Sequence, residues 1–379
     1  MGKKSSDDNR HNNTDFELLY VLGMLFVICG HYNVRLLTLG EFFSYDTFHV
    51  PLFFFSSGYF YKRKYSSNID NYLEFAKKKI LHLILPYVAW NVVYYIIAFI
   101  IQYNTEFSIC SPEKMNIRSF IITPFKYADG AVYNIAGWFC ITLFFVQILY
   151  NTICICLKKV KNNYLQFTIL NLCIAAITIC SVAFVDKLPV SLSRTGYLLF
   201  FYNFGFIFHA YIEKYIVKVK PVIVLIICVL LNAYFLITCG HIEPICFSME
   251  RISVKFLSVY ISKAIVGSVF WLMVCRIIPE RIKSTKTVSY FAKHTFSLMM
   301  HQGIAGIIFN GIIIKLFNRE ELLDKYHTRI WFNAFHNKWI LPILICISIL
   351  LACKLYDLIK MIICEKASDK KTGIGVHRH

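Results

Sequence analysis

Long apolar runs separated by short polar segments dominate the chain. Most runs approach the roughly 20 residues that an α-helix needs to cross a hydrocarbon core of about 30 Å. The runs are continuous rather than alternating, which is typical of membrane-spanning helices and not of barrel strands. The pattern predicts an all-α polytopic bundle with ten spans, at residues 16–34, 47–61, 80–102, 134–156, 164–184, 196–213, 221–240, 257–276, 288–316 and 338–363.

Two of these spans have unusual lengths. The second, 47–61, is short and begins at His49-Val50-Pro51, where proline is tolerated in the first helical turn. The ninth, 288–316, is long enough that we expect a kink or two separate pieces.

Polar segments flank the apolar region. We therefore expect a polar cytoplasmic N-terminus at 1–15, a transmembrane domain at 16–363 and a polar cytoplasmic tail without regular structure at 364–379. Residues 1–15 do not resemble a signal peptide and no Ala-x-Ala-like cleavage site follows, so the first apolar run is expected to be a true span.

The composition supports a membrane protein. The chain is 57% hydrophobic and 16% charged, with net charge +18 and mean hydropathy +0.56. A soluble domain has about 45–50% apolar and about 25% charged residues. The positive charge lies in connecting loops and not in a nucleic-acid patch, and its concentration on alternate loops places both termini in the cytoplasm. No nucleic acid partner is expected.

Known motifs for metals and phosphates are absent from the sequence. The fourteen cysteines include no Cys-x-x-Cys pair, and most lie inside apolar runs, where cysteine acts as a small apolar residue. There is no glycine-rich phosphate loop, zinc signature or nucleophile elbow. We therefore expect no metal and no permanently bound cofactor.

Two histidines are the main candidates for chemistry. His31 lies near the end of the first apolar run and His49 near the start of the second, so a short loop places both at similar depth on the non-cytoplasmic side. An ionisable side chain at membrane depth is unfavourable and marks a functional site. A neutral imidazole can take the proton of a hydroxyl group. The alternative is that both histidines only cap helix ends.

Carboxylates and small residues lie close to this pair in the sequence. Asp46 or Glu41 can orient His31 by accepting an N–H, or can be solvated loop charges. Ser56, Ser57 and Gly58 favour close packing of helices.

A basic cluster precedes the third span. Lys77, Lys78 and Lys79 lie at the expected cytoplasmic face, where they can bind the phosphates of a cytosolic polyanion. The alternative is that these charges set the topology and bind anionic lipid.

The first apolar run resembles the opening helix of the acyltransferase 3 family, whose members move acyl groups, usually acetyl, to sugars of surface polysaccharides. Glu17-Leu18-Leu19 followed by an apolar run and His31 fits this helix, and Phe48 to Gly58 resembles the family's second helix. Later segments fit in the same order, namely Leu85-Pro86-Tyr87, Gly137-Trp138-Phe139 and Thr295 to His301.

The resemblance supports His31 as the base and His49 as a second catalytic candidate, and it implies His301 as a third histidine of the site. Asp46 joins them because of its place in the connecting loop. The expected donor-binding end combines the family positions Tyr20, Lys79 and His82 with Glu17, Lys77 and Lys78, which are added for their charge and place in the sequence.

The chain departs from the family pattern at two positions of the donor-binding end. Tyr20 stands where the family usually has arginine, and Lys79 and His82 replace an Arg-x-x-Arg pair. Lysine binds phosphate as a point charge without bidentate geometry.

The sequence thus predicts a membrane O-acyltransferase, expected in a bacterial inner membrane. The donor would be acetyl-CoA or another acyl-CoA, and the acceptor would be a hydroxyl of a glycan or lipid-linked saccharide. Membrane lipid would surround the protein. A transporter or flippase, using Lys263 and Lys354 as midplane charges, is the main alternative. A catalytically inactive scaffold is a third reading, suggested by Tyr20.

Overall fold

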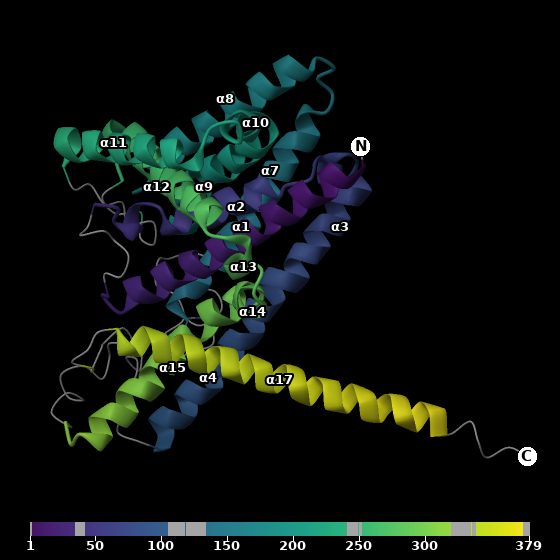
Figure 1. Cartoon of the computed structure of the whole chain (residues 1–379), viewed down its shortest axis with the longest axis vertical. Helices are drawn as coiled ribbons and strands as arrows, with labels where there is room; N and C mark the ends of the chain where they lie inside the picture. The colour runs from purple at the N-terminus through teal and green to yellow at the C-terminus, as the bar shows by residue number, and fades with distance from the viewer. Residues whose placement is uncertain are drawn as a thin grey trace, which may run out of the picture.

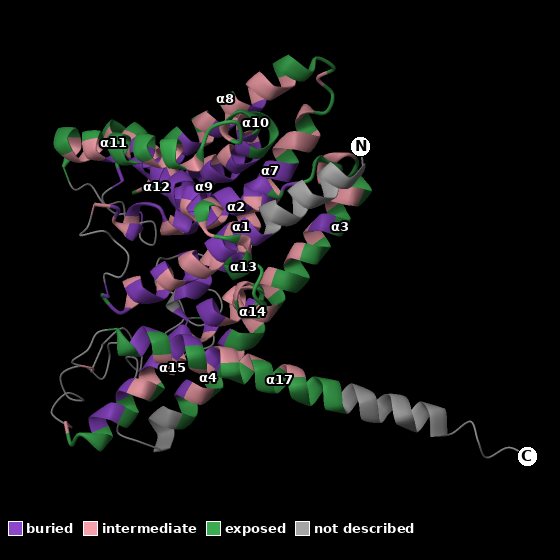
Figure 2. Cartoon of the chain, in the orientation of Figure 1, coloured by how far each residue is buried: buried purple, intermediate pink, exposed green. Residues whose placement is uncertain are grey.

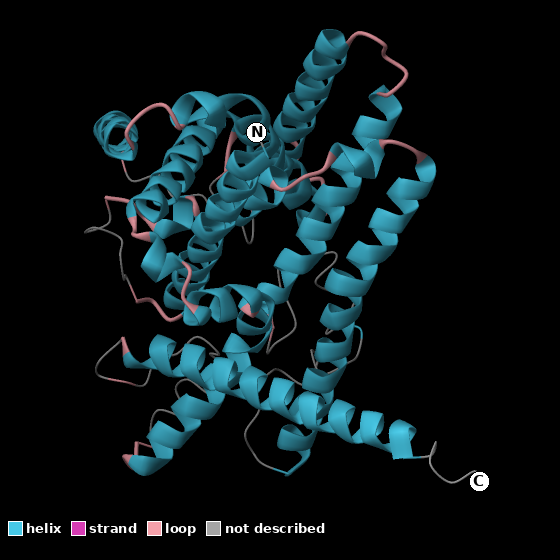
Figure 3. Cartoon of the chain, turned by 45° about the vertical axis from the view of Figure 1, so that its right-hand side comes forward, coloured by secondary structure: helices cyan, strands magenta, loops and turns pink. Residues whose placement is uncertain are grey.

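Helices make up nearly all of the regular structure in the computed structural model (Figures 1 and 3). The structure describes residues 2–34, 42–104, 118, 134–240, 249, 252–319, 335 and 339–373. No β-strand occurs in these ranges, which confirms the all-α prediction.

The first half of the chain forms the helices α1 (Gly2–His31), α2 (His49–Tyr59), α3 (Ile69–Lys79), α4 (Leu85–Asn104), α7 (Trp138–Leu157) and α8 (Asn163–Ala183). The second half forms α9 (Val190–Ile207), α10 (Glu213–Ile216), α11 (Pro221–Cys239), α12 (Leu257–Ile277), α13 (Glu280–Lys283), α14 (Lys286–Lys293), α15 (Thr295–Leu316) and α17 (Ile340–Gly373). Short 3₁₀ turns occur at Tyr45–Thr47 (η1), Arg63–Ser66 (η2), Ile135–Gly137 (η5) and Val254–Phe256 (η7), and π-helical turns at Ile80–Ile84 (η3) and Phe208–Ile212 (η6).

Eight helical stretches among the described residues are long and apolar enough to cross a membrane. They correspond to all of the predicted spans except the second and the sixth. In the second, α2 has 11 residues and is about 16 Å long, too short to cross a core of about 30 Å. In the sixth, α9 carries buried Ser191, Ser193, Arg194 and Asn203, which lower its hydropathy.

The ninth predicted span consists of two helices, as expected. α14 ends at Lys293 and α15 begins at Thr295, with His294 between them. The third predicted span instead belongs to a longer rod, because α3, the π-turn η3 and α4 follow one another without a break from Ile69 to Asn104.

The helix of the last span runs further than the sequence suggested. α17 continues to Gly373 (Figure 1), so the expectation of a tail without regular structure from residue 364 is wrong up to that residue. Once a helix has formed, each added residue gains one hydrogen bond, so good helix formers such as Glu365, Lys366 and Ala367 extend it. The start of α1 and the end of α17 lie on the same side of the bundle (Figure 1).

The short helix α2 occupies the centre of the bundle, where Figure 2 shows most buried residues. It packs against α9, α1 and α12. A Cβ atom added at Gly58 would lie 1.8 Å from the Tyr202 carbonyl oxygen, and one at Gly205 would lie 2.0 Å from the Phe55 carbonyl oxygen. The two backbones therefore touch, as the small-residue sequence of α2 predicted.

A buried ionic cluster joins α1 to the helices that follow α9. Lys283 pairs with Asp15, Arg276 pairs with Glu213, and the Arg276 Nε lies 3.7 Å from Asp15 Oδ2. The Tyr59 hydroxyl donates to Glu213 Oε2 at 2.7 Å. Asp15, which the sequence placed at the end of the polar N-terminus, is thus 6% exposed and paired. Removal of one partner would leave a buried charge, which is strongly unfavourable.

Candidate active site

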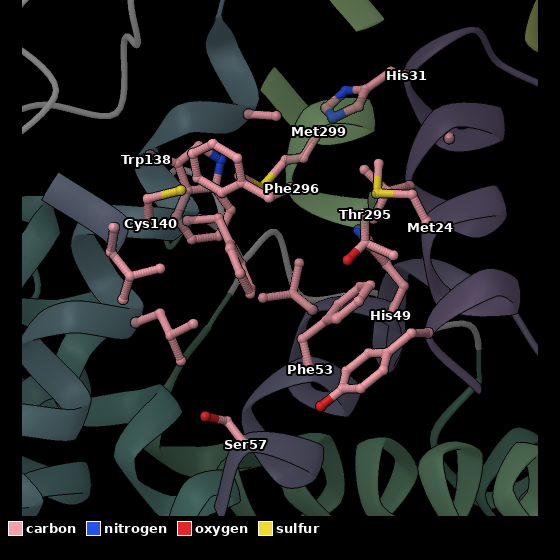
Figure 4. Close-up of a pocket in the computed structure, with 18 of the residues that line it drawn as sticks. Met24, His31, His49, Phe53, Ser57, Trp138, Cys140, Thr295, Phe296 and Met299 are labelled. Atoms are coloured by element: carbon pink, nitrogen blue, oxygen red, sulfur yellow. The ribbon is translucent and has the colours of Figure 1, made fainter. Parts of the chain in front are cut away.

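A cavity of about 570 Å³ lies beside α1 and α2 (Figure 4), within the usual size range of small-molecule sites. Four helices, η1, η5 and the π-turn before α4 supply its walls. The lining residues are Tyr20, Met24, Val27, Gly30, His31, Asp46, His49, Val50, Phe53, Ser57, Leu83, Ala136, Trp138, Phe139, Cys140, Leu143, Thr295, Phe296 and Met299.

One face of α1 forms the first wall. Tyr20, Met24, Val27 and His31 follow one another at intervals of four, three and four residues, which places them on one helical stripe. Eleven residues of α-helix rise about 16 Å, so Tyr20 and His31 lie toward opposite ends of this wall.

One face of α2 forms the second wall. His49, Val50, Phe53 and Ser57 all line the cavity. Ser57 follows His49 by eight residues, about 12 Å along the helix. Figure 4 shows Ser57 far from His31, so the two histidines and Ser57 define opposite ends of the cavity.

The backbone fixes the proton position in neutral His49. Its Nδ1 lies 2.6 Å from the Tyr45 carbonyl oxygen, an atom that only accepts hydrogen bonds, so Nδ1–H is the donor. The Nε2 atom of the neutral ring then has its lone pair available, as a base or hydrogen-bond acceptor requires. His31 and His49 are close enough to interact electrostatically.

The loop carboxylate predicted to assist the histidines lies at the same end. Asp46 lies in the 3₁₀ turn η1, lines the cavity and interacts electrostatically with His49. The other candidate, Glu41, lies outside the described residues. Three of the four predicted catalytic residues, His31, His49 and Asp46, are therefore brought together.

His301, the fourth, is not among the residues that line the cavity. Its Nδ1 bonds the Tyr94 hydroxyl, and its ring lies edge-on to Trp90 with centroids 4.4 Å apart. The cavity-facing residues of α15 are Thr295, Phe296 and Met299, so His301 faces α4 instead. Its catalytic role stays a prediction from the resemblance.

The residues predicted to bind the donor fall into two groups. Tyr20 lines the cavity, whereas Glu17, three residues earlier on α1, is half-buried outside it. The basic residues lie at the end of α3, just before Leu83, which lines the cavity from within the π-turn η3. The π-turn η3 places Leu83 in the cavity wall. Such turns are frequent at functional sites.

The basic residues themselves are mostly solvent-accessible. Lys78 pairs with Glu74 at 2.6 Å, and the Lys79 ammonium lies 5.2 Å from the centre of the Phe75 ring. His82 is exposed, with its Nδ1 2.7 Å from the Lys78 carbonyl oxygen. Lys77 is also exposed. The rod from α3 to α4 runs antiparallel to α7, because the Tyr72 hydroxyl bonds that of Thr152 and Tyr87 lies against Gly137. The three lysines therefore lie at about the level of Gln147, which bonds Ser57 at the cavity end opposite to the histidines.

The two lysines considered for a transport pathway do not face the cavity. Lys263 is buried within α12, and Lys354 is exposed on α17. Neither is among the lining residues.

The sequence reasoning missed Arg194. This side chain is fully buried on α9, and its guanidinium lies 4.7 Å from the centre of the ring of Trp138, a cavity-lining residue. The cation supports this wall by a cation–π contact. The available signal was an arginine directly before a predicted span, since a charge at membrane depth marks a functional site. It was missed because the predicted sixth span began at residue 196.

Comparisons with known proteins agree with this picture at the family level. No curated protein and no solved structure gave a significant match to the chain. Residues 13–357 match the acyltransferase 3 family model, described as an acyltransferase domain, and the match includes both histidines and every wall of the cavity. The chain therefore belongs to the acyltransferase 3 family.

Proposed function

We propose that this protein is a membrane O-acyltransferase that transfers an acyl group, acetyl in the simplest case, from cytoplasmic acyl-CoA. The acceptor is a hydroxyl of a glycan or lipid-linked saccharide at the outer side of a bacterial inner membrane. Family membership and the eight described helices that are long and apolar enough to cross a membrane fit a membrane acyltransferase; the donor, the acceptor and the orientation are our proposals.

One observation carries the proposal: a single cavity has a histidine pair at one end and a basic cluster beside the other. His31 and His49 lie at the first end, and Leu83 joins the wall to the helix that ends in Lys77, Lys78 and Lys79. A donor with phosphates and a long arm matches this arrangement. Its phosphates bind the cluster, and its arm carries the thioester along the cavity.

The histidine pair can activate the acceptor. His31 takes the proton of the acceptor hydroxyl, and the hydroxyl oxygen forms a bond to the thioester carbon while the carbon–sulfur bond breaks. The CoA sulfur leaves as a thiolate and takes up the proton that His31 removed, which gives a free thiol and a neutral His31. The lone pair on His49 Nε2 accepts a hydrogen bond from the hydroxyl or from His31, and the Asp46 carboxylate lies close enough to His49 to interact with its charge.

The wall opposite α1 suits a saccharide acceptor. Trp138 lines the cavity with Phe139 beside it, and Arg194 packs on the indole. Aromatic side chains have apolar faces that pack against apolar surfaces, which the C–H face of a sugar ring offers.

The proposal is tested with purified protein in detergent or vesicles. We expect release of free CoA thiol from acetyl-CoA, detected with a thiol reagent, that depends on an added saccharide acceptor and is lost in His31→Ala. Binding of acetyl-CoA without turnover for any of a panel of surface glycans would favour the scaffold reading. Absence of acetyl-CoA binding would refute the donor assignment.

A further inference from the structure

Ser57 places a hydroxyl group at the cavity end that lies far from the histidines. It follows Phe53 by one turn on the cavity face of α2, and Figure 4 shows it far from His31. Its neighbour Ser56 behaves differently, since the Ser56 hydroxyl donates to the Leu52 carbonyl oxygen of its own helix at 2.8 Å. Of the two serines, only Ser57 faces the cavity.

The side chain of Gln147 bonds the Ser57 hydroxyl from outside the cavity lining. This side chain is 3% exposed on α7, and its Nε2 lies 2.7 Å from Ser57 Oγ. Its Oε1 is buried without a hydrogen-bond partner among the described residues. A glutamine buried in a membrane bundle is unfavourable when part of its amide has no hydrogen-bond partner.

The pair has hydrogen-bonding capacity to spare in either orientation of the glutamine amide. If Nε2 donates to Ser57, the serine proton is available for a ligand; if the amide is turned, Ser57 donates to Oε1 and its oxygen can accept from a ligand. Only Ser57 presents this capacity to the cavity. A ligand amide, with a carbonyl and an N–H, is satisfied in both cases.

We propose that Ser57 binds an amide group of the pantetheine arm of the acyl donor, with Gln147 as the residue that positions its hydroxyl. This inference rests on the proposed function and assigns one contact of that site. Along α2, Ser57 lies about 12 Å from His49. The basic cluster lies at the level of Gln147 on the antiparallel neighbour of α7, so the segment of donor that passes Ser57 is the arm between the phosphates and the thioester. The arm of CoA carries amides at this place.

A saccharide fits this end of the cavity less well. Phe53, one turn before Ser57 and stacked on Tyr20, and Leu143, one turn before Gln147, are apolar. Besides Ser57 and the Tyr20 hydroxyl, these side chains offer no hydrogen bonds to a molecule rich in hydroxyl groups. An arm with isolated amides between methylene groups matches a few isolated polar contacts among apolar walls.

The experiment measures binding of two probes to purified protein by titration calorimetry. Acetyl-CoA contains the arm, and adenosine 3′,5′-bisphosphate contains phosphates without it. We expect Ser57→Ala to weaken acetyl-CoA binding about tenfold, the effect of one hydrogen bond, and to leave binding of the bisphosphate unchanged. The turnover number should fall less than threefold while the Michaelis constant for acetyl-CoA rises, because the contact is remote from the reacting carbon.

Two further variants separate this role from a structural one. Ser56→Ala is the matched control and should leave both probes unaffected. Gln147→Met keeps the side-chain volume but loses the bond to Ser57, and it should weaken acetyl-CoA binding by a smaller factor that does not add to that of Ser57→Ala.

The outcomes are distinct. Unchanged acetyl-CoA binding in Ser57→Ala, with normal binding by the unaltered protein, would overturn the Ser57 inference and leave the proposed function intact. Equal weakening of both probes would also overturn it, since the arm would then not be the contact. No acetyl-CoA binding by the unaltered protein would overturn both.

Discussion

Tyr20 of α1 stacks against Phe53 of α2, with ring centroids 6.0 Å apart and ring planes 15° apart. Both rings line the cavity, on the walls that lead to His31 and His49 respectively. At Gly23, one turn from Tyr20, an added Cβ would lie 2.9 Å from the Phe53 ring, so the ring is held closely against α1. Position 20, where the family usually has arginine, therefore has a packing role in this chain, and the proposed donor would need cations from other positions.

Replacing Tyr20 tests whether the neighbouring lysines have taken over that role. We expect Tyr20→Arg to be tolerated and to tighten acyl-CoA binding, because an arginine there can extend its charged group toward the membrane mouth. Lys79→Ala should be more damaging in the native protein than in the Tyr20→Arg background. A double-mutant cycle on the Michaelis constant measures this coupling, and additivity within about 0.5 kcal/mol would mean that the two positions do not share the donor.

The catalytic assignment predicts a contrast between two histidines. His31→Ala should lower turnover by about 100-fold or more, the usual effect of losing a base. His301→Gln should lower it by less than about tenfold, because His301 packs against Trp90 and Tyr94 outside the cavity lining. Both variants must insert and express normally. A loss of similar size in the two would restore His301 to the catalytic set.

The basic cluster should act on donor binding rather than on the chemical step. Charge reversal of Lys77, Lys78 and Lys79 together should raise the Michaelis constant for acyl-CoA by roughly tenfold, with a smaller effect on turnover. The effect should shrink at high salt, which screens exposed charges. Glu74→Gln removes the partner of Lys78 and should shift the constant in the opposite direction. Without these shifts, the cluster is only a topology signal.

The α2–α9 crossing predicts a sharp difference between two glycines. Gly58→Ala would place a Cβ 1.8 Å from the Tyr202 carbonyl oxygen, so the helices must separate, at a cost of about 3 kcal/mol or more. Gly311→Ala has nothing within 4 Å of its new Cβ and should be neutral or raise stability by about 0.5–1 kcal/mol. Thermal unfolding in detergent compares them. Similar midpoints for the two variants would show that the crossing tolerates a methyl group.

The charge distribution predicts the orientation. Cysteines introduced at Lys62 or Lys64, in a background without native cysteines, should be protected from an impermeant thiol reagent in intact cells. Cysteines in the 35–46 loop should react. The reverse labelling pattern would invert the topology and place the histidine end of the cavity in the cytoplasm.

The sequence alone determined the class of protein, the helical architecture, the family and two of the site's key residues. Each of these depends on local signals: apolar runs of membrane length, the unusual length of the ninth run, and histidines at the ends of apolar runs. The family motifs are local as well, since they follow the order of the chain. Such local patterns can be recognised in the sequence without knowledge of which helices pack together.

Only the tertiary structure decided which faces meet. It showed that α2 is a short central helix, that His31, His49 and Asp46 share a cavity, and that His301 faces α4. It also paired Asp15 with Lys283 and set Arg194 against Trp138, contacts between residues far apart in the chain. Helical periodicity says which residues share a face but not which helix that face meets. That choice depends on close packing between helices, as at Gly58 and Gly205, and on pairing every buried charge.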